Sequence, residues 1–197
     1  MNDRKILLVG VGGQGTILAS KILSWIALEQ NKDVKMSEIH GMAQRGGAVV
    51  TQIVVSDRVY SPTIEPGEAD TMLSFELLEA KRSLHFLQKD GLLVVNEQRL
   101  IPMSVLTGTQ SYPTDVIDTL KAHTSNLRLI PALEEALKLG NPRVANVVVL
   151  GALSEMWKEI PVDIWEKALI ANVPSRHLET NQMAFAAGRK LAEKPEV

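Results

Sequence analysis

The amino-acid sequence predicts an α/β fold in which helices flank a largely parallel sheet and a helical C-terminal part follows. Three observations support this prediction. Short apolar runs alternate with amphipathic segments over about residues 1–131, as in successive β-α-β units. The first of these runs, in KILLVG, leads directly into a glycine-rich turn and a helical pattern. From about residue 132 onward the apolar periodicity is that of helices.

The alternating region sets the expected order of elements. Continuous apolar or β-branched runs mark strands, whereas apolar residues near a 3.6-residue period mark helices. The proline and glycine residues of SPTIEPGEAD indicate a connecting loop, and Asp90-Gly91 indicates the end of a helix. Residues 98–113 are expected to form short, irregular β structure. Strands are expected at residues 5–9, 34–39, 48–55, 71–75, 92–95 and 128–131, and helices at 13–30, 75–88 and 115–122.

The last third of the chain is expected to be helical. Proline and glycine interrupt the pattern at residues 140–142, at Pro161 and at Pro174, because proline cannot continue a helix. Asn146 begins an apolar helical run, where capping or a hydrogen bond into the core is favoured over contact with a ligand. These breaks predict several short helices rather than one long one.

The length of the chain supports one domain with a core of its own. At 197 residues the chain is long enough to bury a sizeable apolar interior. We expect a single domain over residues 1–197, with a Rossmann-like α/β core in about 1–131 and a helical tail in about 132–197.

Composition excludes several functions. The net charge is only −2, and a general nucleic-acid surface needs a strongly basic face. The chain has no cysteine, so it supplies no thiolate nucleophile and no cysteine-ligated zinc or iron–sulfur cluster. No residue stands out as a general acid or base, and the histidines lack the spacing of metal ligands. We therefore expect no catalytic residue and no metal site on this chain.

The apolar segments are too short to cross a membrane. ILLVGVGG leads into a turn rather than a cleavage site, so no signal peptide is expected. The cytoplasm is the expected location, without a membrane partner.

The first glycine-rich loop has the spacing of a nucleotide-binding turn. Gly10, Gly12 and Gly15 match the pattern G-x-G-x-x-G, with Gly13 as an additional glycine and Gln14 beside it. Glycine allows the sharp turn, and the amides at the start of the next helix attract a phosphate or carboxylate. Close packing of strand and helix explains the glycines equally well. The loop alone therefore predicts a turn that can receive an anion.

A dinucleotide-binding site would also need an acidic residue at the end of the second strand, to bind the ribose. Glu38 stands at about that position. However, His40 and a second glycine-rich loop follow it, and a simple dinucleotide-binding unit does not require them. An NAD-dependent oxidoreductase stays open as an alternative.

The second glycine-rich loop, in HGMAQRGG, combines flexible backbone with donors and a fixed positive charge. Arginine offers a planar pair of donors for a phosphate or carboxylate. A tight bend with a solvated arginine is the simpler explanation, but the density of special residues favours a binding or interface role. The candidate residues are His40, Gly41, Gln44, Arg45, Gly46 and Gly47.

Together the two loops resemble a known family. GVGGQGTILASKIL followed by SEIHGMAQRGGAVVTQIVVSD resembles the gamma domain of the 2-oxoacid:ferredoxin oxidoreductases. The short, separate form with HGMAQRGG looks most like the beta subunit of the indolepyruvate type. The resemblance extends over nearly the whole chain, through ADTMLSFELLEAKR, GLLVVN, NVVVLGAL and ETNQMAFAAGRK.

The resemblance implies a function. Enzymes of this family oxidatively decarboxylate a 2-oxoacid with coenzyme A, giving an acyl-CoA, carbon dioxide and reduced ferredoxin. In the indolepyruvate type the substrate is an aryl pyruvate. Thiamine diphosphate and iron–sulfur clusters are expected on a larger alpha subunit, which agrees with the absence of cysteine here. This chain would be the small subunit, holding no cofactor alone and inactive by itself.

The matching residues suggest where the small subunit acts. We expect the two loops to lie together at the carboxyl ends of adjacent parallel strands and to form an edge that faces the alpha subunit and the CoA phosphates. A noncatalytic structural subunit that binds no ligand stays open beside this hypothesis. The residues that match the family's loops are Gly10, Gly12, Gly13, Gln14 and Gly15 in the first, and His40, Gly41, Gln44, Arg45, Gly46 and Gly47 in the second.

Overall fold

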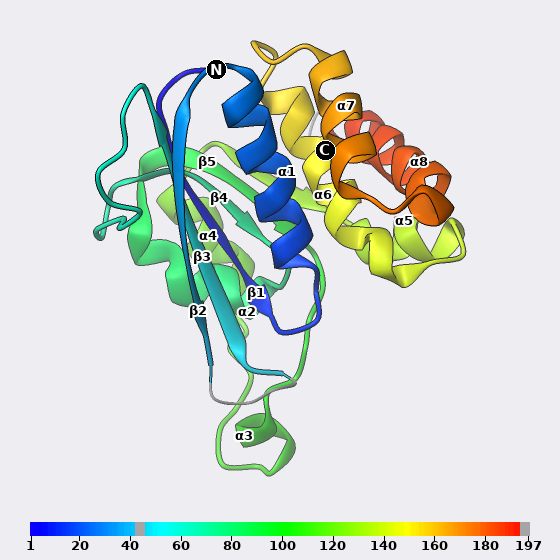
Figure 1. Cartoon of the computed structure of the whole chain (residues 1–197). Coiled ribbons are helices and arrows are strands. Elements are labelled where there is room, and N and C mark those ends of the chain that lie inside the picture. The colour runs from blue at the N-terminus through cyan, green and yellow to red at the C-terminus, as the bar shows by residue number, and fades with distance from the viewer. Residues whose placement is uncertain (42–45, 194–197) are drawn as a thin grey trace.

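The computed structural model describes residues 1–41 and 46–193 (Figure 1). Its centre is a six-stranded sheet with the strand order β2-β3-β1-β4-β5-β6. The six strands are β1 (Arg4–Val11), β2 (Asp33–His40), β3 (Ala48–Ser56), β4 (Ala69–Ser74), β5 (Leu87–Asn96) and β6 (Leu127–Ile130).

The sheet is mixed. β1, β4, β5 and β6 run parallel to one another, whereas β3 runs antiparallel to both β1 and β2. The predicted α/β fold is confirmed, but the first two strands are not neighbours, because β3 lies between them. The sequences explain this order. β3 reads AVVTQIVVS, without a charged residue, and suits the interior of the sheet. β2 reads DVKMSEIH, with charges at Asp33, Lys35 and Glu38, and takes the solvent-exposed edge.

Helices cover both faces of the sheet (Figure 1). They are α1 (Thr16–Glu29), α2 (Leu77–Ser83), α3 (Met103–Leu106), α4 (Val116–His123), α5 (Ala132–Lys138), α6 (Ala145–Met156), α7 (Val162–Asn172) and α8 (Ser175–Ala192), with 3-10 turns at Leu84–Phe86 and Pro142–Val144. None of these helices, in the part of the chain that the structure describes, has the length and hydropathy needed to cross a membrane.

The two faces of the sheet bury two separate apolar clusters. Ile6 and Leu8 of β1 pack with α1 and with α5–α8, whereas Leu7 and Val9 pack with α2 and α4. This alternation follows from the two-residue period of a strand. The first cluster extends from β1 to α8, so the C-terminal helices share a core with the sheet.

Two sequence predictions differ from the structure. Residues 98–113 contain no strand and instead form a loop that carries α3. The helix expected over 75–88 ends at Ser83, and β5 begins already at Leu87. Leu87 pairs with Ala69 of β4, so pairing within the sheet ends the helical segment early.

The helices α6 and α8 cross in close contact. A Cβ atom on Gly151 of α6 would overlap the carbonyl group of Phe185, and one on Gly188 of α8 would overlap the carbonyl group of Val148. At each glycine, a backbone carbonyl group of the other helix therefore occupies the space that a side chain would need. This approach lets α8 cover α6, in which nine consecutive residues, from Asn146 to Ser154, are buried.

Candidate functional site

The carboxyl ends of β1, β4 and β5 lie at one edge of the sheet, because these strands are parallel. The chain leaves β1 toward α1 on one face and leaves β4 toward α2 on the other. Such a divergence of connections opens a crevice at the carboxyl ends, where ligands of open α/β sheets commonly bind. The first glycine-rich loop lies at this crevice.

The first loop needs its glycines for two different reasons. Gly13 and Gly15 have φ angles of 98° and 80°, in the left-handed region that favours glycine. Gly10 is in β1, where a Cβ atom would lie 2.8 Å from Oε1 of Gln14 and 3.2 Å from Cβ of Phe75. The loop thus combines backbone turns with close packing.

The start of α1 has no side-chain cap and no acidic residue. Gly15 is its N-cap, without a side-chain hydrogen bond, and the first turn contains no acidic residue. The first amide that bonds back along the helix is that of Ala19, which donates to the Gly15 carbonyl at 3.2 Å. The amides before it have no partner of that kind within the helix, as at any helix start.

The second loop joins β2 to β3 and lies against the first. The Gly12 amide donates to the Gly47 carbonyl at 2.9 Å, and the Gly41 amide donates to the Ala48 carbonyl at 2.7 Å. Gly46 has a φ angle of 80°. Gln44 and Arg45, which are also candidates, lie outside the described residues. The loops meet because β3 pairs with β1 in antiparallel register, so the expectation of adjacent parallel strands is wrong.

His40 and Glu38 lie at the outer edge of the sheet. The half-exposed His40 ring forms an ion pair with the Glu38 carboxylate when the ring is protonated, and Thr51 donates to Glu38 at 3.2 Å. β3 separates Glu38 from β1, at about 5 Å per strand. This separation removes Glu38 from the position that a ribose-binding acid takes beside the first loop.

A cluster of three amide side chains holds the first loop to the neighbouring strands. Oε1 of Gln14 accepts a hydrogen bond from the Val11 amide at 2.7 Å. Its Nε2 donates to the Phe75 carbonyl at 2.9 Å and to Oε1 of Gln98 at 3.0 Å. Asn96 donates to the same two acceptors at 3.1 and 3.2 Å. The loop is therefore fixed to the carboxyl ends of β4 and β5.

A cavity of about 190 Å³ lies beside this cluster. Nδ2 of Asn146, at the start of α6, donates to the Gly15 carbonyl at 3.1 Å and so ties the loop to the C-terminal helices. The exposed Arg143 adds a positive charge, and amides with a cation suit a small polar or anionic group. The polar side chains in the lining are Gln14, Asn96, Gln98, Arg143 and Asn146.

Gln14 was predicted from the sequence as a site residue, whereas Asn96, Gln98 and Arg143 were not. Asn96 and Gln98 directly follow the apolar run of β5, just as the first loop follows the apolar run of β1. Polar residues at the ends of successive parallel strands were the available signal. Arg143 had no such signal, since it comes from the turn before α6.

Glu76 connects the same edge to the loop after β5. Its Oε2 accepts from the Glu79 amide at 2.9 Å, and its Oε1 accepts from the Leu100 amide at 3.0 Å. Burial raises the pKa of Glu76, while these backbone hydrogen bonds act in the opposite direction. Glu76 therefore caps α2 and fixes the beginning of the following loop.

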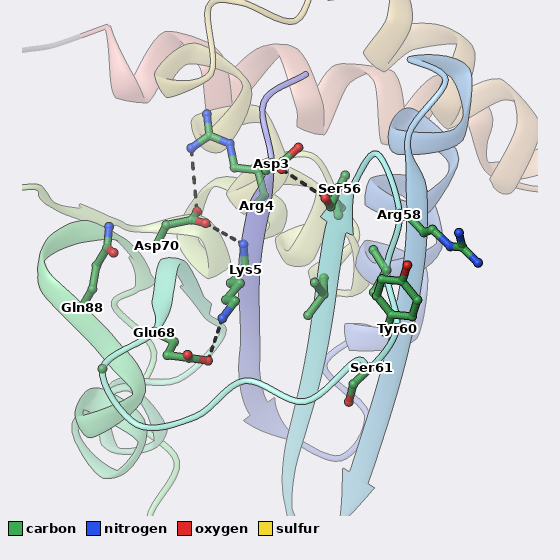
Figure 2. Close-up of a pocket in the computed structure, with 14 residues that line it drawn as sticks. Asp3, Arg4, Lys5, Ser56, Arg58, Tyr60, Ser61, Glu68, Asp70 and Gln88 are labelled. Carbon is green, nitrogen blue, oxygen red and sulfur yellow. Dashed lines mark hydrogen bonds and ion pairs between the residues drawn. The ribbon is translucent and has the colours of Figure 1, made fainter.

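A larger cavity, of about 630 Å³, lies at the opposite end of β1 (Figure 2). Most of its charged groups form ion pairs, whereas Arg58 lies over the ring of Tyr60. Arg4 bonds to Glu159 at 2.6 Å, Lys5 bonds to Glu68 at 2.7 Å, and the Lys5 amide donates to Asp70 at 2.5 Å. Since most of these charges are already paired, this cavity offers a charged ligand less than the glycine-loop edge does.

Asp70 in this cavity makes stability depend on pH. Burial raises the pKa of Asp70, so the folded state favours the protonated carboxyl and loses stability as pH rises through the unfolded and then the folded pKa. We predict that Asp70→Asn gains stability relative to the native chain between pH 4 and pH 7. Urea unfolding across this range measures the difference.

Asp3→Asn is the matched control for this experiment. Hydrogen bonds from Lys32 and Ser56 lower the pKa of Asp3, so its contribution has the opposite sign and is lost as pH falls. The free energy of unfolding of the native chain should therefore increase relative to that of Asp3→Asn as pH rises. Parallel pH profiles for the two variants would contradict the assignment.

The described residues contain no group of three or more histidine, cysteine, aspartate or glutamate side chains placed to hold a metal ion. With no cysteine in the whole sequence, the donor set does not fit an iron–sulfur cluster. Backbone amides, amide side chains and Arg143 instead suit contact with a polar or anionic group.

Comparison with known proteins shows relatives over nearly the whole chain. Indolepyruvate oxidoreductase subunit IorB of Thermococcus kodakarensis is 33% identical over 200 residues, covering 98% of each chain. The gamma subunit of the keto/oxoacid ferredoxin oxidoreductase from Geobacter sulfurreducens has the same fold, with a TM-score of 0.73, 24% identity and coverage of 98% and 97%.

A second solved structure places the same fold within a longer chain. The 2-oxoglutarate:ferredoxin oxidoreductase of Magnetococcus marinus, solved with 2-oxoglutarate, coenzyme A and succinyl-CoA, gives a TM-score of 0.73 at 20% identity. The match covers 100% of this chain and 32% of that one. The profile of the pyruvate ferredoxin/flavodoxin oxidoreductase family matches residues 5–191. The chain therefore belongs to the pyruvate ferredoxin/flavodoxin oxidoreductase family.

Proposed function

We propose that this chain is the small subunit of a thiamine-dependent 2-oxoacid:ferredoxin oxidoreductase of the indolepyruvate type. The observation that carries the proposal is the 33% identity with an indolepyruvate oxidoreductase subunit across 98% of both chains. The extension of one apolar core from β1 to α8 supports a single gamma-type domain over residues 1–197.

The proposed reaction breaks the bond between C1 and C2 of an aryl pyruvate and releases carbon dioxide. A thioester bond forms between the remaining acyl carbon and the sulfur of CoA. Two electrons pass to two oxidised ferredoxins, and the thiol proton is released. Thiamine diphosphate and iron–sulfur clusters supply this chemistry in the complex, and we assign them to the larger subunit, since the residues of this chain do not fit a cluster.

The contribution of this chain is an edge made of its two glycine-rich loops. Among the described residues, a Cβ atom on Gly13 or Gly46 would meet no heavy atom within 4 Å, which favours close approach of a ligand to the backbone there. The uncapped start of α1 suits a phosphate. We propose that this edge faces the larger subunit and the phosphates of CoA, with Arg45 adding charge.

Reconstitution tests the proposal. The isolated chain should give no turnover with indolepyruvate, CoA, thiamine diphosphate and oxidised ferredoxin. Adding the chain to the large subunit should raise turnover at least about tenfold, with aryl pyruvates preferred to pyruvate and 2-oxoglutarate. Turnover by the isolated chain, or no change on mixing, would contradict the proposal.

A structural subunit without a ligand is the remaining alternative. Hydrogen exchange in the reconstituted complex separates the two, because CoA bound at the edge should slow exchange of the amides at residues 12–18. If exchange of these amides slows when the subunits assemble but does not change further when CoA is added, the structural role is favoured.

A further inference from the structure

The loop after β5 projects beyond the edge of the sheet and carries α3 at its far end (Figure 1). We call residues 97–115 the arm. No residue of the arm is buried, although the structure describes all of it. Tyr112 is partly buried and packs against the core from the end of the arm. α3 has no buried residue, so its exposed apolar side chains call for an explanation other than the stability of the isolated chain.

The arm is nevertheless held in one shape by polar contacts. At its base, the Leu77 amide donates to the Gln98 carbonyl at 3.0 Å, and Leu100 is bound by Glu76. At its tip, the Thr109 hydroxyl donates to the Ser104 carbonyl at 2.7 Å. The Thr107 hydroxyl donates to the Met103 carbonyl at 2.9 Å. These bonds preorganise the arm, which lowers the entropy cost of binding a partner.

Between its charged ends, the arm carries exposed apolar side chains and no charge. Ile101, Met103 and Leu106 are 46%, 70% and 65% exposed. Residues 100–114 contain no charged side chain. Exposed apolar side chains together with a lack of charge are typical of the centre of a protein–protein interface. An anionic membrane surface would instead call for unpaired lysine or arginine beside the apolar residues. Lys81 and Arg82, which lie beside the arm, form ion pairs with Asp115 and Glu79.

A hollow of about 330 Å³ separates the arm from α2. Leu78 of α2 and Pro102, Val105 and Pro113 of the arm supply its apolar lining, with Lys81 and Arg82 at the side. The arm therefore offers both protruding side chains and a recess that can receive a side chain of a partner.

We propose that the arm docks into an apolar recess of the larger subunit, with Met103 and Leu106 as its main contacts. This inference rests on the proposed function. Three exposed side chains cannot bury the roughly 1,200 Å² that a stable interface needs, so the arm must extend a larger contact. The edge with the glycine-rich loops is continuous with it, because β5 and β1 end at the same side of the sheet.

The test measures affinity between purified subunits from one organism. The double variant Met103→Asp with Leu106→Asp should raise the Kd for the larger subunit about 100-fold, since each lost apolar contact costs about tenfold. Its melting temperature should stay within about 2 °C of the native value, because both side chains are exposed in the free chain. Met103→Leu should bind like the native chain.

Leu137→Asp with Met183→Asp is the matched control. Leu137 on α5 and Met183 on α8 are 56% and 51% exposed, and both lie outside the arm. This variant should retain native affinity. The inference would be overturned if both double variants lost the same affinity for the larger subunit, or if the arm variant bound with native affinity. Either result would leave the proposed function intact.

The remaining outcomes concern other partners. If the native chain does not bind the larger subunit at all, the proposed function itself fails. If light scattering shows a native dimer of this chain that the arm variant converts to a monomer, the occupant is a second copy, and the inference is overturned.

Discussion

Replacing Gly188 by alanine is expected to lower the free energy of unfolding by about 3 kcal/mol and the melting temperature by roughly 10 °C. An added Cβ atom would overlap the carbonyl group of Val148 and lie 3.0 Å from the Ala152 amide nitrogen. Backbone atoms cannot turn away as a side chain can, so α6 and α8 would have to separate. Gly151→Ala should lower the free energy of unfolding in the same way, because its Cβ atom would overlap the Phe185 carbonyl group.

The sign of this effect makes the test sharp. Glycine to alanine in the middle of a helix ordinarily stabilises by about 1 kcal/mol, because alanine has the higher helix propensity. The exposed Gln182 on the same helix provides a control, since Gln182→Ala should change stability by less than about 0.5 kcal/mol. Thermal unfolding of Gly188→Ala at or above the native temperature would show that the helices do not cross this closely.

Gln14→Glu is expected to lower the free energy of unfolding by about 2–3 kcal/mol at pH 7. One carboxylate oxygen still accepts the hydrogen bond from the Val11 amide. The other oxygen takes the place of the Nε2 donor and therefore faces two acceptors, the Phe75 carbonyl and Oε1 of Gln98. Gln98 cannot rotate its amide to donate instead, because it would then oppose the donor of Asn96. Asn96 in turn is oriented by the Leu133 amide, which donates to its Oδ1 at 3.3 Å.

The destabilisation caused by Gln14→Glu should be smaller at acidic pH. A carboxyl that faces two acceptors has a raised pKa in the folded state, and its protonated form can donate a hydrogen bond. The deficit is therefore smallest below the unfolded glutamate pKa of about 4.3 and grows as pH rises through it. Urea unfolding at pH 4 and pH 7 checks this, with Gln182→Glu as the exposed control. A deficit independent of pH would contradict the hydrogen-bond network.

Most elements of the fold could be predicted from the sequence, because each depends on neighbours within a few residues. The run ILLV has no alternation and becomes the buried strand β1, and the breaks at Pro161 and Pro174 separate α7 and α8 from the elements before them. The irregular β structure expected over 98–113 was wrong. The segment pairs with no strand, and Ile101, Met103 and Leu106 are exposed on the arm, while Tyr112 packs against the core.

The candidate site could be predicted in part. Both glycine-rich loops were recognised, and the structure joins them through Gly12 and Gly47. Their contact could not be deduced from the order of the strands along the chain, because β3 inserts antiparallel beside β1. The roles of Gln14, Gly15 and Arg45 toward CoA stay predictions.

The sequence by itself determined the local alternation of strands and helices, the two glycine turns and the lack of thiolate ligands. These features depend on backbone preference, short-range periodicity and composition. Only the tertiary structure decided the order of the strands and the close approach of Gly151 and Gly188 to backbone carbonyls. It also decided the amide cluster, which joins residues 84 positions apart, and the bond from Asn146 to Gly15, across 131 positions. Such contacts arise from the packing of distant elements, which no short stretch of sequence specifies.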